Sequence, residues 1–451
     1  MKLEKQKKQQ NIGDERSRTQ KFVDRLKFNR FLRILGPGLI TGAADDDPSG
    51  IATYSQAGAQ FGYGQLWTAL YQIPLLIAVQ ETCARIGAVT GKGLAGVVKE
   101  YSSRNLLAAI VFLVVVANTI NIGADIGAVA SAVQLVVPLP FGVIAITTVL
   151  VVLFLEIFFT YKTYAKFLKF FSLALLSYIL TALLVHEPWD QILHYTVLPH
   201  VQFTFSFLFI ITGVFGTTIS PYMFFWQASG EVEEERVAKL GFTDDCKPLL
   251  TKNFMLNLRI DNTVGMIAAE VAQWFIMITT GTVLFNNGIT DITSAADAAK
   301  ALEPLVRSFP NSGQVAQDIF AIGIIGMGLL AIPVLAGSAA YALAEALSWK
   351  EGLYRKFNQA RGFYLVIIIS TLVGLLLNFI GINPIKALVY SAVFNGVAAV
   401  PLLFVIARIN SNSDILGEYR GGLLSRVIVW TTFGVMACAA LGMFYTLLFI
   451  H

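Results

Sequence analysis

Long apolar stretches, separated by short polar or turn-rich segments, follow one another along almost the whole chain. Each stretch has about the 20 residues that a helix needs to cross the hydrocarbon layer of a bilayer. Eleven such stretches are found, near 35–58, 66–88, 106–135, 141–159, 167–185, 204–228, 263–285, 315–347, 363–381, 384–407 and 427–450. The pattern therefore predicts an all-α polytopic membrane protein with 11 transmembrane helices.

Composition agrees with this prediction, since 55% of the 451 residues are apolar, only 14% are charged and the mean hydropathy is +0.65. Soluble globular domains carry about 25% charged residues. These values exclude a disordered chain, a disulfide scaffold and an ordinary soluble enzyme. The chain has no HExxH, GxSxG or phosphate-loop motif, so we expect neither enzymatic activity nor a bound cofactor.

Charge sets the expected orientation in the membrane. Residues 1–33 hold 11 basic and four acidic residues, a charge of +7, whereas the whole chain has only +4. We therefore expect a cytoplasmic basic tail without fixed structure at 1–33, and a single transmembrane domain at 34–450, with no nucleic-acid partner. The second, fourth and eighth loops are also basic, through Arg85, Lys92, Lys99, Arg104, Lys162, Lys166, Lys169, Lys350, Arg355, Lys356 and Arg361. The positive-inside rule then predicts a cell-membrane (plasma or inner membrane) protein with a cytoplasmic N-terminus and an extracytoplasmic C-terminus.

The first and sixth stretches are each interrupted about halfway. The first is broken at 43–50 by Ala-Ala-Asp-Asp-Asp-Pro-Ser-Gly, and the sixth at 217–222 by Thr-Thr-Ile-Ser-Pro-Tyr. Proline removes a backbone donor and clashes with the preceding turn, so each segment predicts a helix break. Unwound backbone at membrane depth persists only where it lines a cavity or is buried in protein. Breaks five spans apart indicate two inverted five-helix repeats, at about 35–185 and 204–407, with an extra helix at 427–450.

Three consecutive acids occupy the first break. An Asp at the centre of a membrane helix costs about 2.5–3.5 kcal/mol unless water or a cation compensates it. Asp47 directly precedes Pro48 and is best placed to turn its carboxylate into the gap, so we predict it as a cation ligand. Asp45 and Asp46 would lie on the preceding half-helix and are weaker candidates.

Seven short motifs in the first two stretches are specific enough to compare with known families. They are Gly36-Pro37-Gly38, Asp47-Pro48, Ala52-Thr53, Gln56-Ala57-Gly58-Ala59, Phe61-Gly62-Tyr63, Leu66-Trp67 and Thr90-Gly91-Lys92. Together they resemble the first two spans of the NRAMP (SLC11-type) divalent-metal transporters, and the span count and second break extend the likeness over nearly the whole chain. The resemblance implies a LeuT-like fold and transport of Mn²⁺, Fe²⁺ and related ions, usually coupled to protons.

The chain departs from the family at the implied metal ligands. In the family's Asp-Pro-Gly-Asn motif the Asp is Asp47, but the Asn position is Gly50, which offers only backbone. In the sixth span, the family's Met corresponds to Ser220 and its His to Tyr222.

Two further family positions also differ. A second histidine of the family's sixth span appears here as Gln227. A metal-contacting Gln of the tenth span falls at Ala392, with Asn395 nearby as a substitute.

These departures all replace sulfur or nitrogen ligands by oxygen ligands or remove a ligand. Without thioether or imidazole, the expected ligands are the carboxylate of Asp47 and carbonyl or hydroxyl oxygens of Gly50, Thr217 and Ser220. Oxygen ligands favour Mg²⁺, Ca²⁺ and Mn²⁺, and small residues leave room for a cation that keeps its waters, as Mg²⁺ does. We therefore predict a transporter of hard divalent cations that carries Mg²⁺ and also accepts Mn²⁺, similar to the NRAMP-related magnesium transporters.

Proton coupling is a separate question. The family's Asp-Leu-Ala-Glu stretch in the third span corresponds to residues 121–124, Asn-Ile-Gly-Ala, with Asp125 one place later. A neutral Asn cannot relay a proton, so we predict uptake without proton coupling, and Asp125 is the candidate that would restore a proton pathway. Two alternatives stay open: a proton-coupled Mn²⁺/Fe²⁺ importer, and a sodium-coupled organic-solute carrier on the same fold.

Other polar residues lie within or between the apolar stretches. We expect Glu81 and Glu345 to be paired or interfacial, and Glu270 to support the site from a second helix. The polar segment 229–262 is expected to be a solvated loop, with a cation-attracting vestibule as the functional alternative. Nothing in the sequence requires an oligomer.

Overall fold

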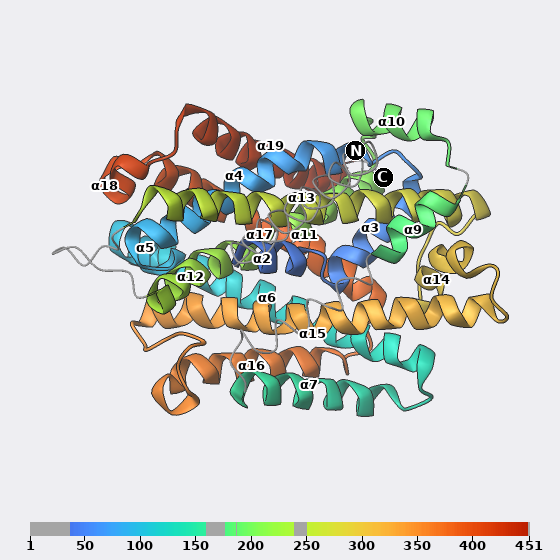
Figure 1. Ribbon diagram of the computed structural model, residues 1–451, viewed down its shortest axis with the longest axis horizontal. Helices are drawn as coiled ribbons and strands as arrows, with labels where there is room; N and C mark the ends of the chain where they lie inside the picture. The colour runs from blue at the N-terminus through green and yellow to red at the C-terminus, as the bar shows by residue number, and fades with distance from the viewer. Residues whose placement is uncertain (1–36, 159–175, 186, 239–249, 450–451) are drawn as a thin grey trace, which may run out of the picture.

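A computed structural model describes residues 37–158, 176–185, 187–238 and 250–449, and in these ranges every regular element is a helix. The predicted tail at 1–33 and the basic residues Lys162, Lys166 and Lys169 lie outside the described residues. The long helices run roughly parallel to one another, along the horizontal direction of Figure 1. The bundle therefore has two ends, at which the connecting segments gather.

Both predicted helix breaks are present. The first span consists of α2 (Pro37–Asp45) and α3 (Pro48–Phe61), and the sixth of α11 (Phe205–Thr218) and α12 (Pro221–Ala238). In each case a proline stands at the first position of the second half-helix, where its missing N–H and fixed φ are tolerated. The same residue cannot continue the preceding helix, so each span stops and restarts at its proline.

Helices also occupy the remaining predicted stretches. They are α4 (Trp67–Thr90), α6 (Arg104–Val136), α7 (Phe141–Phe158), α9 (Leu176–Leu184), α13 (Lys252–Val283), α15 (Ser312–Leu347), α16 (Arg361–Leu377), α17 (Pro384–Ser411) and α19 (Leu423–Phe449). Within the described residues, eight helical segments are long and apolar enough to cross a membrane, and α16 is a shorter apolar helix. Only the last part of the fifth predicted span, α9, is described.

Short helices that the apolar pattern did not predict connect the spans. At one end of the bundle, on the left of Figure 1, lie α5 (Leu94–Tyr101) and α18 (Ser413–Leu416). At the other end lie α10 (Trp189–Val197) and α14 (Ala295–Ala299). The remaining connectors are the 3₁₀ turns η2 (Phe285–Asn287), η3 (Lys300–Val306), η4 (Phe357–Gln359) and η5 (Gly417–Tyr419).

The interpretation of 229–262 as a solvated loop is wrong for its described part. Helix α12 continues to Ala238, and α13 already begins at Lys252. Glu231, Glu235 and Asp261 are buried, and the Asp261 Oδ2 accepts a hydrogen bond of 2.7 Å from the Gly38 N–H. The acids therefore belong to helices packed against the start of α2, which the local polarity of the segment did not reveal.

Pairing of the two acids near the span ends is confirmed. Glu81 forms ion pairs with Arg259 at 2.9 Å and with Arg85 at 3.6 Å. Glu345 accepts hydrogen bonds from the Gly96 N–H at 2.8 Å and from the Ser229 hydroxyl at 3.1 Å. Both acids hold neighbouring helices together.

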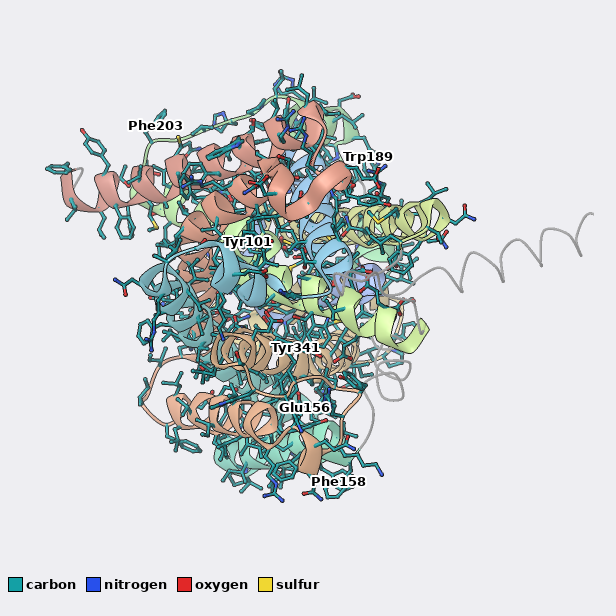
Figure 2. The ribbon with its side chains drawn as sticks, turned by 90° about the vertical axis from the view of Figure 1, so that its left-hand side faces the viewer. Tyr101, Glu156, Phe158, Trp189, Phe203 and Tyr341 are labelled. Carbon is teal, nitrogen blue, oxygen red and sulfur yellow. The ribbon has the colours of Figure 1, made fainter. Side chains whose placement is uncertain are left out.

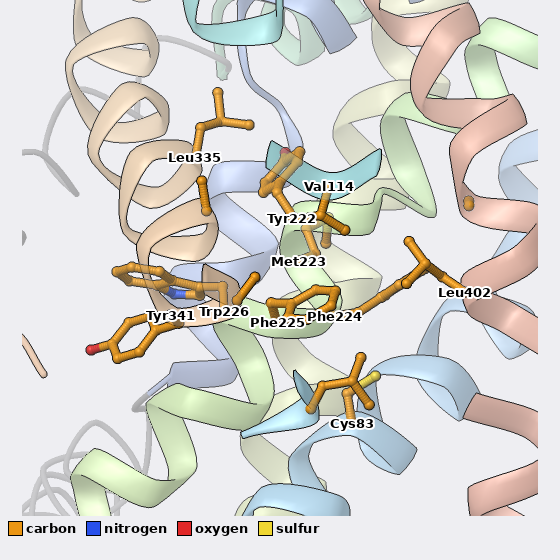
Figure 3. Close-up of a cluster of buried hydrophobic side chains, with 14 of the residues drawn as sticks. Cys83, Val114, Tyr222, Met223, Phe224, Phe225, Trp226, Leu335, Tyr341 and Leu402 are labelled. Atoms are coloured by element: carbon orange, nitrogen blue, oxygen red, sulfur yellow. The ribbon is translucent and has the colours of Figure 1, made fainter. Parts of the chain in front are cut away.

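The second half of the broken sixth span is anchored in the apolar core. Figure 3 shows the side chains of Tyr222 to Trp226 on α12 grouped with Leu335 and Tyr341 of α15, Val114 of α6, Cys83 of α4 and Leu402 of α17. The outer surface, by contrast, carries exposed apolar side chains such as Phe158 and Phe203 (Figure 2). This distribution is that of a helix bundle whose outer face meets lipid.

Helices α11 and α17 approach each other unusually closely. A Cβ on Gly216 would lie 2.2 Å from the Ala392 carbonyl oxygen and 2.3 Å from the Gly396 nitrogen. Only residues without a side chain allow this contact. The close approach brings α17 beside the second helix break.

Candidate functional site

Asp47 lies at the first break and is fully buried. It is the N-cap of α3, with an extended backbone at φ −60° and ψ 171°. Its Oδ1 accepts hydrogen bonds from the Gly50 N–H at 2.7 Å and the Ser49 hydroxyl at 2.6 Å. A capping carboxylate satisfies an otherwise unpaired helix donor, so the break itself holds this acid in place.

The second carboxylate oxygen of Asp47 reaches a different part of the molecule. The Asn121 side-chain amide of α6 donates to Oδ2 at 2.9 Å. The Ser391 hydroxyl of α17 donates in turn to the Asn121 Oδ1 at 2.8 Å. Asn121 is therefore a neutral bridge between Asp47 and the tenth span.

The second break joins this network through Thr217. The Thr217 and Ser49 hydroxyl oxygens lie 3.2 Å apart, within hydrogen-bond distance. Thr217, Ser49, Asp47, Asn121 and Ser391 thus form a buried polar row, called here the Asp47 network. It connects α11, α3, α6 and α17, and so joins helices of both predicted repeats around one carboxylate.

The other residues of the second break face elsewhere. The Ser220 hydroxyl points back to its own helix, where the carbonyl oxygens of Gly216 and Thr217 lie 2.6 and 2.5 Å away. The Tyr222 hydroxyl donates to the Ala44 carbonyl oxygen at 2.9 Å. That carbonyl belongs to the last turn of α2, whose acceptors have no partner within the helix. Tyr222 therefore connects the two breaks.

Gly50 does not leave an open space in this structure. A Cβ on Gly50 would lie 3.0 Å from the Asp45 carbonyl oxygen and 3.3 Å from both the Thr217 hydroxyl oxygen and the Tyr54 ring. The expectation that this small residue widens the site is therefore wrong for the conformation described. The space is filled by the two breaks themselves, which pack directly against each other.

Asp45 and Asp46 are buried beside the site rather than in the Asp47 network. Each has one carboxylate oxygen without a hydrogen-bond partner. Glu270 of α13 is also buried, lacks a partner on both oxygens, and interacts electrostatically with Asp45 and Asp46. Among the described residues, no three His, Cys, Asp or Glu side chains are close enough to hold a metal directly. Asp45 and Asp46 also interact electrostatically with Asp47.

Asp125 and Asn395 lie one helical turn from members of the network. Asp125 follows Asn121 on α6, is fully buried, has no hydrogen-bond partner on either carboxylate oxygen and interacts electrostatically with Asp47. Asn395 follows Ser391 on α17 and is likewise buried without a hydrogen-bond partner. Neither is part of the Asp47 network in this conformation.

Sequence reasoning missed Ser49 and Ser391. Ser49 had a local signal, because Asp-Pro-Ser at a helix start is a typical capping sequence. Ser391 had none, since it is one of many small residues on α17 and its role depends on the contact between α17 and α6.

Comparison with known proteins shows the family of the chain. A sequence model of the family described as Nramp, "Natural resistance-associated macrophage protein-like", matches residues 38–446. The chain belongs to the Nramp family. Members of this family are metal transporters, so the chain is a multi-pass membrane transporter of divalent metals and not an enzyme, and the metal is its substrate.

Individual Nramp relatives are distant in sequence but similar over most of their length. The divalent metal cation transporter MntH of Staphylococcus aureus (strain Mu50) is 26% identical over 431 residues, which cover 93% of this chain and 92% of that protein. The crystal structure of the Eremococcus coleocola manganese transporter in complex with an aromatic bis-isothiourea substituted compound superimposes with a TM-score of 0.72 at 16% identity. It covers 93% of this chain and 87% of its own.

A transporter of another family shares the architecture. Mhp1, a nucleobase-cation-symport-1 family transporter in a closed conformation, has a TM-score of 0.56 at 12% identity, over 92% of each chain. The predicted LeuT-like fold, with broken first and sixth spans, is thereby confirmed.

Proposed function

We propose that this Nramp chain transports hard divalent cations by alternating access, with Mg²⁺ as its main substrate and Mn²⁺ also accepted. The observation that carries the proposal is the Asp47 network, in which one carboxylate accepts hydrogen bonds only from hydroxyl, amide and backbone groups, with no thioether or imidazole in the network. Oxygen donors of this kind favour Mg²⁺ and Mn²⁺ over softer metals. The relatives named for divalent metal cations and for manganese support a divalent substrate.

Asp47 is the proposed anionic ligand, and its present hydrogen bonds indicate how it would bind. Two donors hold Oδ1 and one holds Oδ2, so the carboxylate is oriented without a counter-ion. Mg²⁺ is commonly bound through one or two carboxylates and several retained waters. Thr217 and Gly50 border the carboxylate and are proposed to supply hydroxyl or backbone oxygens to the ion or its waters.

Ser220, Tyr222 and Asn395 have smaller proposed roles. Ser220 would first have to turn its hydroxyl away from the Gly216 and Thr217 carbonyls. Tyr222 is proposed to move with the breaks through its bond to the Ala44 carbonyl. Asn395 would enter the site only after α17 shifts. Asp45 and Asp46 are proposed as weaker ligands that attract the cation together with Glu270.

We also propose that transport proceeds without proton coupling. Asn121 places a neutral amide against Asp47, where a carboxylate would be able to carry a proton. The membrane potential alone contributes about 4.6 kcal/mol for a divalent cation at 100 mV. That driving force suffices to move the cation into the cell. The proposal places the protein in the cell membrane with a cytoplasmic N-terminus. It requires no second subunit.

A proton-coupled Mn²⁺/Fe²⁺ importer is the alternative that a specific observation favours. Asp125 is buried beside Asp47 without a hydrogen-bond partner, as a proton carrier would be, and a structural relative is a manganese transporter. The second alternative, a sodium-coupled organic-solute carrier, has fold similarity to Mhp1 as its only support.

Flux measurements in proteoliposomes separate these functions. Mg²⁺ and Mn²⁺ uptake would be followed together with the internal pH, for the wild type and for Asp125→Asn. We expect uptake of both ions, unchanged internal pH and little effect of the substitution. Acidification that tracks metal entry and disappears in Asp125→Asn would establish the proton-coupled alternative.

A further inference from the structure

Two adjoining cavities lie at the end of the bundle that holds α5 and α18. The larger has a volume of about 710 Å³ and lies between the first turn of α6, the last turn of α17 and the start of α19. The smaller, of about 450 Å³, shares Ser411 and Trp430 with it. Figure 2 looks onto this end of the molecule and shows Tyr101, which lines the larger cavity. None of the residues of the Asp47 network lines either cavity.

Each cavity contains an arginine that lacks an acidic partner among the described residues. Arg408 lines the larger one, with its guanidinium carbon 5.8 Å from the centroid of the Phe404 ring. Arg426 lines the smaller one, and its Nε is buried without a hydrogen-bond partner. Neither arginine takes part in any of the ion pairs found in the described part of the chain. Neither cavity is lined by Asp or Glu.

The other polar groups of these cavities are neutral and small. The larger cavity is lined by the hydroxyls of Ser102, Ser103, Ser411 and Ser413 and by the amide of Asn412. Two arginines with surrounding hydroxyls are the chemistry that binds a phosphate group, since guanidinium donors match its oxygens.

The rim of the cavities is apolar and faces outward. Leu423 is 73% exposed and Val427 52%, and Trp430 and Tyr101 are 39% and 45% exposed. Trp and Tyr are typical of the boundary between lipid tails and head groups. A free phosphate would use only the arginines, whereas a phospholipid would also cover this apolar rim with its acyl chains.

We propose that this Arg408–Arg426 cavity pair binds the head group of an anionic phospholipid, with its acyl chains along α17 and α19. In the predicted orientation the site faces the cytoplasmic leaflet, where anionic lipids attract basic residues. The bound lipid would join the last turn of α17 to the first turn of α6 and to α19, which otherwise contacts the bundle from outside. The proposal does not depend on which metal is transported.

Lipid retention by the purified full chain tests the site. Native mass spectrometry would count phosphatidylglycerol and phosphatidylcholine bound to the wild type and to Arg408→Ala/Arg426→Ala, with Arg361→Ala/Arg420→Ala as the matched control. Arg361 and Arg420 are exposed at the same end but do not line the cavities. We expect the affinity for phosphatidylglycerol to fall roughly 30-fold in the first variant and to stay unchanged in the control. Each basic residue near an anionic head group raises the lipid affinity by a factor of roughly five, so two residues together account for this loss.

Further measurements keep the proposal open to refutation. Arg408→Lys/Arg426→Lys should recover part of the binding, and circular dichroism should show equal helix content in all variants. Equal retention of phosphatidylglycerol by wild type and double Ala variant would overturn the proposal. So would competition by millimolar inorganic phosphate that removes the lipid completely, because the acyl chains would then contribute nothing.

Discussion

The two helix breaks occupy equivalent places in the fold but have different chemistry. At the first break, Asp47 caps its own half-helix and receives hydrogen bonds from another span. At the second break, Ser220 turns back to the carbonyls of its own helix. The first break therefore provides a fixed charge. The second provides neutral oxygens, of which the Ser220 hydroxyl is already hydrogen-bonded within its own helix.

This difference indicates how the site is divided between the repeats. The buried charge of Asp47 requires compensation by donors or by a cation, and three donors come from α3 and α6. A neutral break requires no such partners and is freer to rearrange. We therefore infer that the first break binds the cation through a fixed charge. The second break is inferred to adapt to the size of the ion and so to set which ion is preferred.

The largest expected effect comes from removing the charge of the first break. Asp47→Asn keeps a good helix cap but loses a Coulomb attraction of about 4 kcal/mol per pair of unit charges at 4 Å. We expect a loss of Mg²⁺ affinity of roughly a thousandfold or more. Ser220→Ala, the counterpart at the second break, removes one neutral group and should lower the affinity only about fivefold. Calorimetric titration of both variants checks the contrast, and similar losses in the two would contradict it.

The second break should affect which ion is preferred more than how tightly Mg²⁺ binds. Ser220→Met places a thioether where the family has one, and sulfur favours softer ions. The ratio of Cd²⁺ to Mg²⁺ uptake should rise at least roughly tenfold, which corresponds to about 1.4 kcal/mol. Ser206→Met serves as the control, because Ser206 is exposed near the start of α11. An unchanged ratio would show that the second break does not contact the ion.

The Asn121 bridge should have an intermediate effect. Asn121→Ala removes a donor to a charged carboxylate, a bond of about 1.5–3 kcal/mol, so the Mg²⁺ affinity should fall at least roughly tenfold. Asn118, one turn away on α6, donates to the Leu335 carbonyl instead. Asn118→Ala should therefore lower thermal stability while leaving the affinity unchanged. Equal Mg²⁺ affinities in both variants would show that Asn121 does not contribute to the site.

The smallest effect concerns pH and arises outside the Asp47 network. Glu187 accepts hydrogen bonds from Thr282 and Tyr63, and burial raises the pKa of its carboxyl above its usual range. Its stabilising contribution is therefore complete at pH values below the ordinary pKa of Glu, and is lost as the pH rises through the raised folded-state value. Glu187→Gln should lessen the fall in melting temperature between pH ~4 and pH ~7. Metal uptake should keep its pH profile, because Glu187 is not part of the Asp47 network.

Sequence predicted the features that are local in the chain. The breaks are marked by Pro48 and Pro221, and the crossings by their apolar length, so both were found within a few residues. The burial of Glu231 on an extended α12 was not foreseen, because a polar segment looks the same in a loop and on a packed helix.

The partners within the site depended on tertiary contacts. Ser391 reaches Asp47 only through Asn121, and α17 approaches α11 only because Gly216 and Gly396 carry no side chain. The Asp45 carbonyl and Thr217 fill the space beside Gly50, which residue size alone did not predict. The place of Asp47 at the first break was thus predictable, and the arrangement of the groups around it was not.

Voltage-driven Mg²⁺ uptake by proteoliposomes, compared between the wild type and Asp47→Asn, tests the central claim most directly. Both proteins would be reconstituted at equal density, with helix content checked by circular dichroism. We expect a wild-type influx that grows with the inside-negative potential at constant internal pH, and no influx above protein-free liposomes for Asp47→Asn. Wild-type rates in Asp47→Asn would show that the first break does not hold the transported cation.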